Sequence, residues 1–388
     1  MVIVLLIGGP FIKFFSNQKI LNPIRDDGPE DHIIKKIGTP TMGGVIILFG
    51  LLISVLCWGN LSNINIIFCI YIAISFGLLG AFDDYKKIKF NNSSGVSFKF
   101  KIIIQVIIAV LVSLILINFS DHSDLKYLYF PFFKNLLINL GWFFIPFAAF
   151  IIVGSSNAVN LTDGLDGLAT VPVILVASCF AFISYVTGNI VFSEYLQIPY
   201  IEGVGEVAVF LGSIIGACLG FLWFNAPPAK IFMGDGGALM LGVLLAASTV
   251  SVGGRTDAAY SGQSFFFFAP LLISLVILGV PIIDVLFAII RRIATPGLSV
   301  TTADKDHLHH RLLRLGHGHR RVVFILWAWT ALLSGFVLWP TYSGRGDGIV
   351  PMGIAGVCLI LFTLLHPRLQ TNKPKKNEIV AEDRSPEL

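Results

Sequence analysis

Long apolar runs dominate the pattern along this chain. About eleven of them are long enough to cross the roughly 30 Å hydrocarbon core of a bilayer as helices. They cover residues 1–15, 43–58, 64–82, 102–118, 136–153, 168–187, 207–224, 237–252, 265–290, 322–340 and 349–365. The polar segments between them are too short to bury a core of their own. The pattern predicts an all-α, polytopic membrane bundle of 10–11 transmembrane helices over residues 1–366 and excludes a soluble protein.

The two ends of the chain differ from this pattern. The first run contains Gly8, Gly9, Pro10 and Lys13, and no small-residue cleavage site follows it. We therefore expect a span whose beginning is missing rather than a cleaved signal peptide. Residues 367–388 are rich in Lys, Glu and Pro, a composition with too few apolar side chains to repay ordering, so we expect a disordered cytoplasmic tail.

Positive charge predicts the orientation of the bundle. Only 13% of the residues are charged, against 55% that are hydrophobic. Lys13, near the end of the first run, and the segments after odd-numbered runs together hold eighteen Lys and Arg, the tail holds five, and the segments after even-numbered runs hold four. Because Lys and Arg concentrate on the cytoplasmic side of membrane proteins, we expect the odd-numbered loops in the cytoplasm and the N-terminus outside.

The odd-numbered loops also carry the polar residues that are capable of chemistry. Their signatures are Lys35–Gly44, Asp83–Lys87 with Lys99 beyond it, Asn157–Gly167, Asn225–Gly237 and Asp304–Arg311. Since all five loops are predicted on one side of the bilayer, they can converge on one site.

Three carboxylates in these loops suggest a cation site. Asp83 and Asp84 directly follow an apolar run, where adjacent, poorly solvated carboxylates need a cation or a basic partner. Asp235 lies in a glycine-flanked turn that suits Mg²⁺, which takes few protein ligands and keeps phosphate oxygens and waters. The simpler interpretations are an acidic helix cap and an ordinary turn aspartate.

A second group of polar residues recurs every three positions. If Asn157, Asn160, Asp163 and Asp166 are helical, their side chains share one face. Capping of the following helix is the alternative. Phe232 offers a ring on which a nucleobase could stack, although a phenylalanine in a membrane protein is more often in the core or lipid-facing.

The last loop is rich in hydrogen-bond donors. His307, His309 and His310 lie beside Arg311 and Arg314, which favours binding of an anion such as a phosphate. A zinc site is the alternative, but the loop has no Cys and its cations would repel the metal. A solvated basic face is the simpler interpretation.

Carboxylates for Mg²⁺ together with cations for phosphate, on one side of a bundle, suggest phosphoryl transfer to a lipid-embedded acceptor. The five motifs, in order and over nearly the whole chain, resemble the polyprenyl-phosphate N-acetylhexosamine-1-phosphate transferases. The resemblance implies transfer of a sugar 1-phosphate from a UDP-linked amino sugar to undecaprenyl phosphate, with Mg²⁺ as cofactor and release of UMP. It further implies a multi-pass protein of the bacterial inner membrane with an active site facing the cytoplasm. It is compatible with a homodimer and implies no nucleic-acid partner.

The resemblance also implies roles for single residues. Asp83 or Asp84 would deprotonate or position the lipid phosphate, and Asp235 would bind Mg²⁺. The implied substrate contacts are Asn160, Asp163 and Asp166 at the nucleotide, Phe232 stacked on uracil, Lys36, Lys87 and Lys99 at phosphates or uridine, and His307, His309 and His310 over the diphosphate or sugar.

Two parts of the chain resemble different branches of that family. Up to about residue 236, Ile24–Glu30 and Gly38–Gly44 are similar to the branch that acts on UDP-MurNAc-pentapeptide. Beyond it, Pro281–Asp284, Asp306–Arg311 and an eleventh span are similar to the branch that acts on UDP-GlcNAc. Because the first part is longer, we expect UDP-MurNAc-pentapeptide as the donor, with UDP-GlcNAc as the alternative. One interpretation of the two resemblances is a chain joined from two branches.

Two other classes of membrane protein fit the pattern less well. An intramembrane aspartyl protease would need its acids within spans, whereas Asp83, Asp84 and Asp235 fall at run ends or in loops. A transporter would place ionisable residues near the middle of the bilayer, where Asp284 is the one acid well inside a run.

Overall fold

The computed structural model describes eight stretches of the chain and a few isolated helical positions. The stretches are residues 1–18, 39–90, 95–119, 127–129, 137–196, 200–252, 308–343 and 349–371, and the isolated positions are 284, 286, 287, 290 and 291. Lys36 and His307 lie outside the described residues, as does nearly all of the expected run 265–290.

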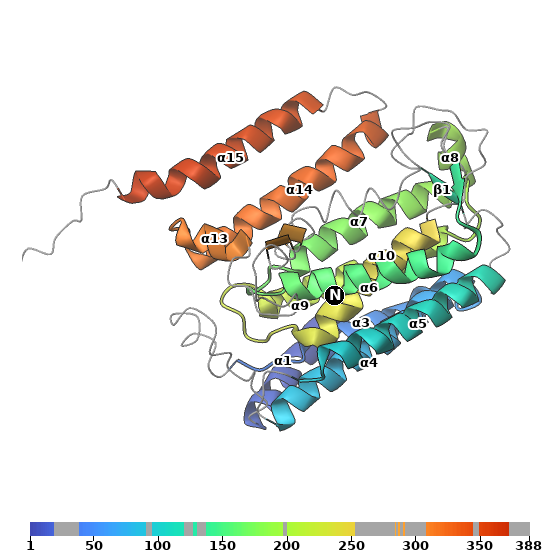
Figure 1. The fold of residues 1–388 in the computed structure, drawn as a ribbon, viewed down its shortest axis with the longest axis horizontal. Coiled ribbons are helices and arrows are strands. Elements are labelled where there is room, and N and C mark those ends of the chain that lie inside the picture. The colour runs from blue at the N-terminus through green and yellow to red at the C-terminus, as the bar shows by residue number, and fades with distance from the viewer. Residues whose placement is uncertain are drawn as a thin grey trace, which may run out of the picture.

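Helices form almost all of the described structure (Figure 1). They are α1 (Val2–Asn17), α3 (Gly43–Trp58), α4 (Ile64–Lys89), α5 (Phe98–Phe119), α6 (Phe144–Thr162), α7 (Thr170–Thr187), α8 (Ile190–Leu196), α9 (Gly205–Asn225), α10 (Gly234–Val252), α13 (Leu308–Arg314), α14 (His319–Ser343) and α15 (Ile349–Thr371), with a single 3₁₀ turn at Gly141–Phe143. Within the described residues, seven helices are long and apolar enough to span a membrane, and three shorter apolar helices accompany them. The prediction of an all-α, polytopic membrane protein is confirmed.

Several helices continue beyond the apolar runs that predict them. α4 extends to Lys89 and α6 to Thr162, so two of the expected polar loops are in fact the ends of membrane helices. A helix satisfies its own backbone hydrogen bonds and needs no break where it leaves the hydrocarbon. α15 likewise reaches Thr371, past the boundary expected at residue 366.

A short antiparallel hairpin was not predicted. β1 (Tyr127–Tyr129) pairs with β2 (Leu137–Asn139), with Leu128 opposite Ile138. β2 lies within the run 136–153, which was predicted to be helical from its first residue, whereas α6 begins only at Phe144. Three-residue strands are too brief to show a clear alternation of apolar and polar positions.

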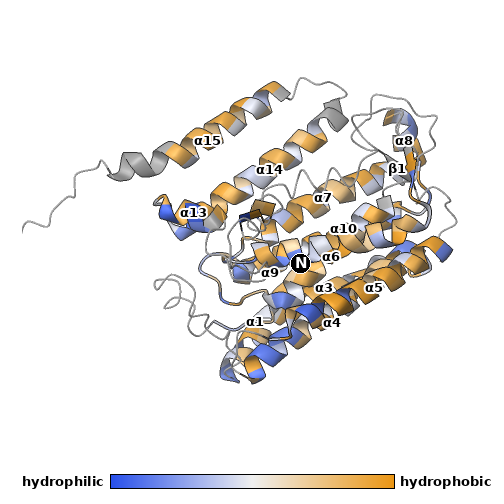
Figure 2. Cartoon of the chain, viewed as in Figure 1, coloured by the Kyte–Doolittle hydropathy of each residue, from blue (hydrophilic) through white to orange (hydrophobic). Residues whose placement is uncertain are grey.

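α10 lies at the centre of the bundle. Of its most apolar 18-residue window, 89% is buried inside the protein, compared with 28% for α5. It packs against α3, α4 and α6, while α5 lies on the outside, where its apolar side chains can face lipid (Figure 2). The polar start of α10 is therefore surrounded by other helices.

A separate apolar cluster joins the chain on either side of residue 236. Leu165 and Leu168, which follow α6, are buried against residues of α13 and α14, namely Leu312, Val322, Val323, Ile325 and Leu326. α10 also packs on α4 and α6. The two parts that resemble different branches thus share packed interfaces.

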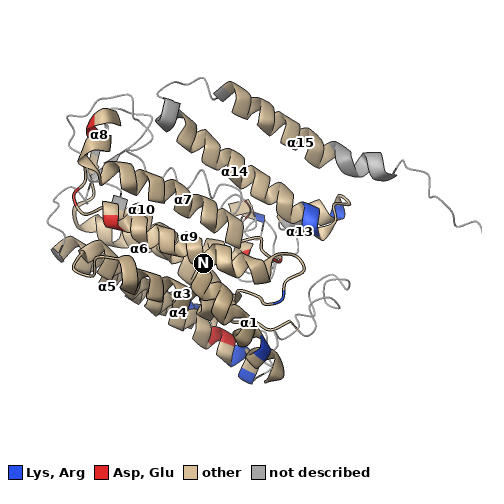
Figure 3. Ribbon diagram, turned by 180° about the vertical axis from the view of Figure 1, so that it is seen from behind, with Lys and Arg blue, Asp and Glu red and all other residues tan. Residues whose placement is uncertain are grey.

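The two ends of the bundle differ in charge. The C-terminal end of α4, the start of α10, the α9–α10 connection and α13 lie at one end, where the Lys and Arg positions are concentrated (Figure 3). α8 and the β1–β2 hairpin lie at the other end (Figure 1). Several of the expected polar loops therefore do meet at one end of the bundle.

Candidate active site at the basic end of the bundle

Asp84 is placed by α4 against the first turn of α10. Its Oδ1 accepts a hydrogen bond from the backbone N–H of Asp235 at 3.1 Å, and its Oδ2 accepts one from the backbone N–H of Gly236 at 3.0 Å. The first N–H groups of a helix have no partner within the helix, and a carboxylate there also interacts favourably with the helix dipole. Asp84, a buried residue of another helix, thereby caps α10.

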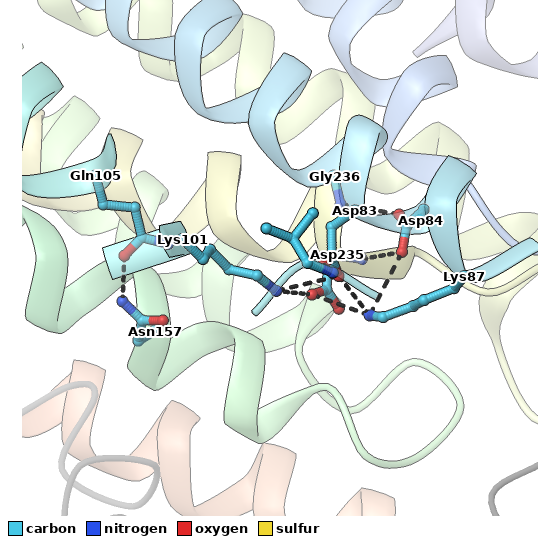
Figure 4. Close-up of polar contacts among 9 residues, drawn as sticks. Asp83, Asp84, Lys87, Lys101, Gln105, Asn157, Asp235 and Gly236 are labelled. Atoms are coloured by element: carbon cyan, nitrogen blue, oxygen red, sulfur yellow. Dashed lines mark hydrogen bonds and ion pairs between the residues drawn. The ribbon is translucent and has the colours of Figure 1, made fainter. Parts of the chain in front are cut away.

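Asp83 and Asp235 share two lysine ammonium groups (Figure 4). Lys87 Nζ lies 2.6 Å from Asp83 Oδ2 and 3.1 Å from Asp235 Oδ2. Lys101 Nζ, on α5, lies 3.1 Å from Asp83 Oδ2 and 2.6 Å from Asp235 Oδ2. Asp83 Oδ1 accepts a further hydrogen bond from Val96 N at 2.7 Å. Three helices thus contribute to one network of buried charges.

The three carboxylates fit a divalent metal ion. Asp83, Asp84 and Asp235 each offer an oxygen, and these oxygens lie within 4.8 Å of one another. When all three are ionised they carry three negative charges, against two positive charges on the lysines that contact them. Carboxylate oxygens are the hard donors that Mg²⁺ prefers. Asp235 is the most accessible of the three, with 18% of its side chain exposed, whereas that of Asp83 is fully buried.

Glycines allow the close approach of helices that this network requires. A Cβ on Gly44 of α3 would overlap the backbone of Gly237, and a Cβ on Gly80 of α4 would overlap the carbonyl of Asp235. Gly234, at the start of α10, has φ +75°, and a Cβ there would collide with the carboxylate of Asp84. The start of α10 is therefore held tightly between α3 and α4.

The predicted nucleotide residues lie at and beyond the end of α6. Asn160 is half-buried in the last turns of α6, Asp163 is the C-cap of that helix, and Asp166 lies in the connection to α7. Asp166 Oδ2 accepts a hydrogen bond from Ala229 N at 3.1 Å, which links this connection to the one that leads to Asp235. Asn157, one helical turn before Asn160, instead donates to Gln105 Oε1 of α5 at 2.6 Å.

Asn225, the last residue of α9, binds the same two connections together. Its Oδ1 accepts hydrogen bonds from Gly167 N at 3.1 Å and from Thr170 Oγ1 at 3.0 Å. Its Nδ2 donates to Ile231 O at 3.0 Å. The side chain is buried, and both its oxygen and its nitrogen form hydrogen bonds within the protein. The sequence marks Asn225 only as the first residue of a polar loop.

Phe232 is held through its backbone. Its N–H donates to Pro40 O at 2.9 Å, and its carbonyl accepts from Gly43 N at 2.9 Å. Met233 O accepts from Gly44 N at 2.8 Å in the same way. The segment before α3 and the segment before α10 therefore lie side by side, and the half-buried Phe232 ring lies three residues from Asp235.

The remaining predicted residues divide into two groups. Lys87 contacts the acidic cluster of Asp83, Asp84 and Asp235. Lys99 is exposed, and the lysine of α5 that contacts this cluster is Lys101. Lys101 is outside the set predicted from the sequence, although its spacing of four from Gln105 places both on one face of α5. His310 lies half-buried in α13, and for His309, in the same helix, the structure describes the backbone alone.

Comparison with known proteins identifies the family. Residues 64–253 match the family described as Glycosyl transferase family 4, and residues 36–48 match phospho-N-acetylmuramoyl-pentapeptide-transferase signature 1. The chain is 72% identical over 265 residues to the phospho-N-acetylmuramoyl-pentapeptide-transferase of Pelagibacter ubique (strain HTCC1062), covering 68% of this chain and 73% of that protein. It is 50% identical over 243 residues to the one from Bartonella quintana (strain Toulouse), covering 63% and 67%. With this similarity and a site of three carboxylates and two lysines, the chain belongs to the phospho-N-acetylmuramoyl-pentapeptide-transferases of glycosyl transferase family 4 and is a phospho-sugar transferase.

Proposed function

We propose that this enzyme transfers phospho-MurNAc-pentapeptide from its UDP-linked form to undecaprenyl phosphate and releases UMP. An oxygen of the lipid phosphate becomes bonded to the phosphorus that carries the sugar, and the bond from that phosphorus to the oxygen of UMP is broken. The observation that carries the proposal is the network in which Asp83 and Asp235 share Lys87 and Lys101 at the basic end of a membrane bundle. The names of the similar proteins favour this donor.

Lys87 and Lys101 are proposed to bind phosphate oxygens of the two substrates. Their ammonium groups neutralise carboxylates in the described structure, and the same charge would stabilise the anionic oxygens between which the phosphoryl group moves. Because both side chains are largely buried, little water competes with these contacts.

Asp83 and Asp235 are proposed to hold Mg²⁺, which neutralises charge on the diphosphate when it is bound. Asp84 is less suited to that role, because both of its oxygens already accept hydrogen bonds from the start of α10. Asp83 is also proposed to position the lipid phosphate or to accept its proton, and its contacts with Lys87 and Lys101 support a location beside the proposed phosphate site.

The last turns of α6 and the α6–α7 connection are proposed to bind the nucleotide. Asn160, Asp163 and Asp166 supply polar side chains, and the Phe232 ring supplies a surface for uracil. The hydrogen bond between Asp166 and Ala229 N supports this arrangement, because it brings the connection next to the segment that contains Phe232. Lys36 and the histidines of residues 307–310 remain proposed contacts of uridine and of the diphosphate or sugar.

The basic end of the bundle is proposed to face the cytoplasm of a bacterial cell. The concentration of Lys and Arg at that end supports this orientation (Figure 3). UDP-linked sugars are soluble substrates, whereas the polyprenyl chain lies in the bilayer, so an active site at this boundary is accessible to both. A homodimer is compatible with the exposed apolar faces of the outer helices.

One assay tests the proposed function directly. Purified protein is given undecaprenyl phosphate and Mg²⁺, with either UDP-MurNAc-pentapeptide or UDP-GlcNAc, and UMP release is measured. We expect UMP from the muramoyl donor only. Release from UDP-GlcNAc alone would assign the enzyme to the other branch, and no release from either donor would contradict the transferase function of this chain.

A further inference from the structure

Trp327 connects α14 to the turn that follows Asp166. Its indole Nε1 donates a hydrogen bond to the carbonyl of Gly167 at 3.2 Å, across 160 positions of sequence. The side chain is half-buried, and its ring makes an edge contact with Phe324 at 5.1 Å between centroids. The contact therefore comes from a helix that contributes none of the acids or lysines of the active-site network.

The peptide groups of Gly167 are held from two sides. While the carbonyl accepts from Trp327, the N–H donates to Asn225 Oδ1 at 3.1 Å. Gly167 has φ +70°, which favours glycine. A Cβ at this position would lie 3.4 Å from the Trp327 ring and 3.5 Å from the carbonyl of Asn225. The turn is thus fixed between α9 and α14.

Apolar packing reinforces the hydrogen bond. Leu165 and Leu168, on either side of the turn, are buried in the cluster with residues of α13 and α14, and Trp327 packs against that cluster. Asp166 lies between them, with its own Oδ2 bound to Ala229 N. The position of the Asp166 carboxylate therefore depends on α14 as well as on the helices adjoining the turn.

We propose that Trp327 is a positioning residue for binding of the donor nucleotide. It holds the Gly167 carbonyl, and through it the turn containing Asp166, in the place required for contact with the nucleotide. The inference rests on the proposed function in that it takes this turn as the nucleotide site. A displacement of about 1 Å in a group that positions a substrate is enough to reduce activity substantially.

The test compares Trp327→Phe with Trp329→Phe. Both remove one indole N–H from α14, but Trp329 packs against the same apolar cluster without a hydrogen bond to the turn among the described residues. For Trp327→Phe we expect the KM for the UDP-linked donor to rise about three- to tenfold, as loss of one hydrogen bond predicts. In Trp327→Phe, the KM for undecaprenyl phosphate is expected to stay within about twofold of that of the unaltered enzyme. In Trp329→Phe, both KM values are expected to stay within the same range, because this substitution removes no hydrogen bond to the turn.

Hydrogen exchange supplies a measurement that does not depend on turnover. Amides of residues 164–169 are expected to exchange faster in Trp327→Phe and unchanged in Trp329→Phe. An unchanged donor KM in Trp327→Phe, an equal rise in both variants, or unchanged exchange would overturn the role of Trp327. If the unaltered enzyme releases no UMP, the proposed function fails, and the Trp327 proposal is then tested by hydrogen exchange and by calorimetric titration with UMP. Equal affinity for UMP in Trp327→Phe and in the unaltered protein would overturn the role of Trp327.

Discussion

The carboxylate of Asp84 accepts a hydrogen bond from the backbone N–H of Asp235 at 3.1 Å. One aspartate of the acidic cluster thus fixes the backbone that carries another. The two have different environments, because Asp84 is occupied by the start of α10 whereas Asp235 pairs with Lys87 and Lys101. Substitutions at the two positions should therefore have different consequences.

Asp84→Asn is expected to destabilise the protein. The amide nitrogen of Asn cannot accept a hydrogen bond, so one buried N–H at the start of α10 loses its partner. The free energy of unfolding should fall by about 1–3 kcal/mol, with a lower thermal midpoint in detergent and reduced UMP release. A variant that melts like the unaltered protein but has no activity would instead place Asp84 in direct contact with metal or substrate.

Asp235→Asn is expected to abolish Mg²⁺-dependent turnover while the protein stays folded. The substitution removes the most accessible charged oxygen of the acidic cluster and so weakens binding of Mg²⁺. Loss of a cation that neutralises developing charge lowers kcat about a hundredfold or more. UMP release across a range of Mg²⁺ concentrations measures this. Glu206→Gln, in the first turn of α9 at the opposite end of the bundle, is the matched control. Full activity of Asp235→Asn would refute its assignment to the metal.

Lys101→Met is expected to reduce kcat/KM about a hundredfold, whereas Lys99→Met stays within about twofold. The two lysines are two residues apart on α5, but Lys101 Nζ contacts Asp83 and Asp235 and Lys99 is exposed. The steady-state kinetics of UMP release distinguish them. An effect of equal size at both positions would show that general basic charge, rather than the contact with the acids, accounts for activity.

Gly44→Ala is expected to impair both stability and activity. Its added methyl group overlaps the backbone of Gly237, so α3 and α10 must separate near Asp235. Overpacking of a tight core costs about 1–3 kcal/mol. Gly154→Ala adds the same group to α6, where nothing lies within 4 Å, and should melt and react like the unaltered enzyme. Thermal unfolding and UMP release of the two variants provide the comparison.

The sequence was sufficient for the class of fold, because a bilayer imposes a length and composition on every span. The runs at 43–58 and 168–187 predict α3 and α7 to within two residues. It was also sufficient for the presence of a carboxylate site, since Asp83, Asp84 and Asp235 stand at the ends of apolar runs, where charge requires a partner. The distribution of Lys and Arg also predicted that several polar loops lie on the same side of the bundle.

Only the tertiary structure decided which partners each residue of the site contacts. Adjacent carboxylates such as Asp83 and Asp84 have the same chemistry in sequence and differ only in what other helices bring to them: the start of α10 for one, Lys87 and Lys101 for the other. The choice of Lys101 over Lys99 depends on which face of α5 meets α4. The contact of Trp327 with Gly167 joins positions 160 residues apart. Such relationships arise from helix packing, which side-chain patterns along one helix do not encode.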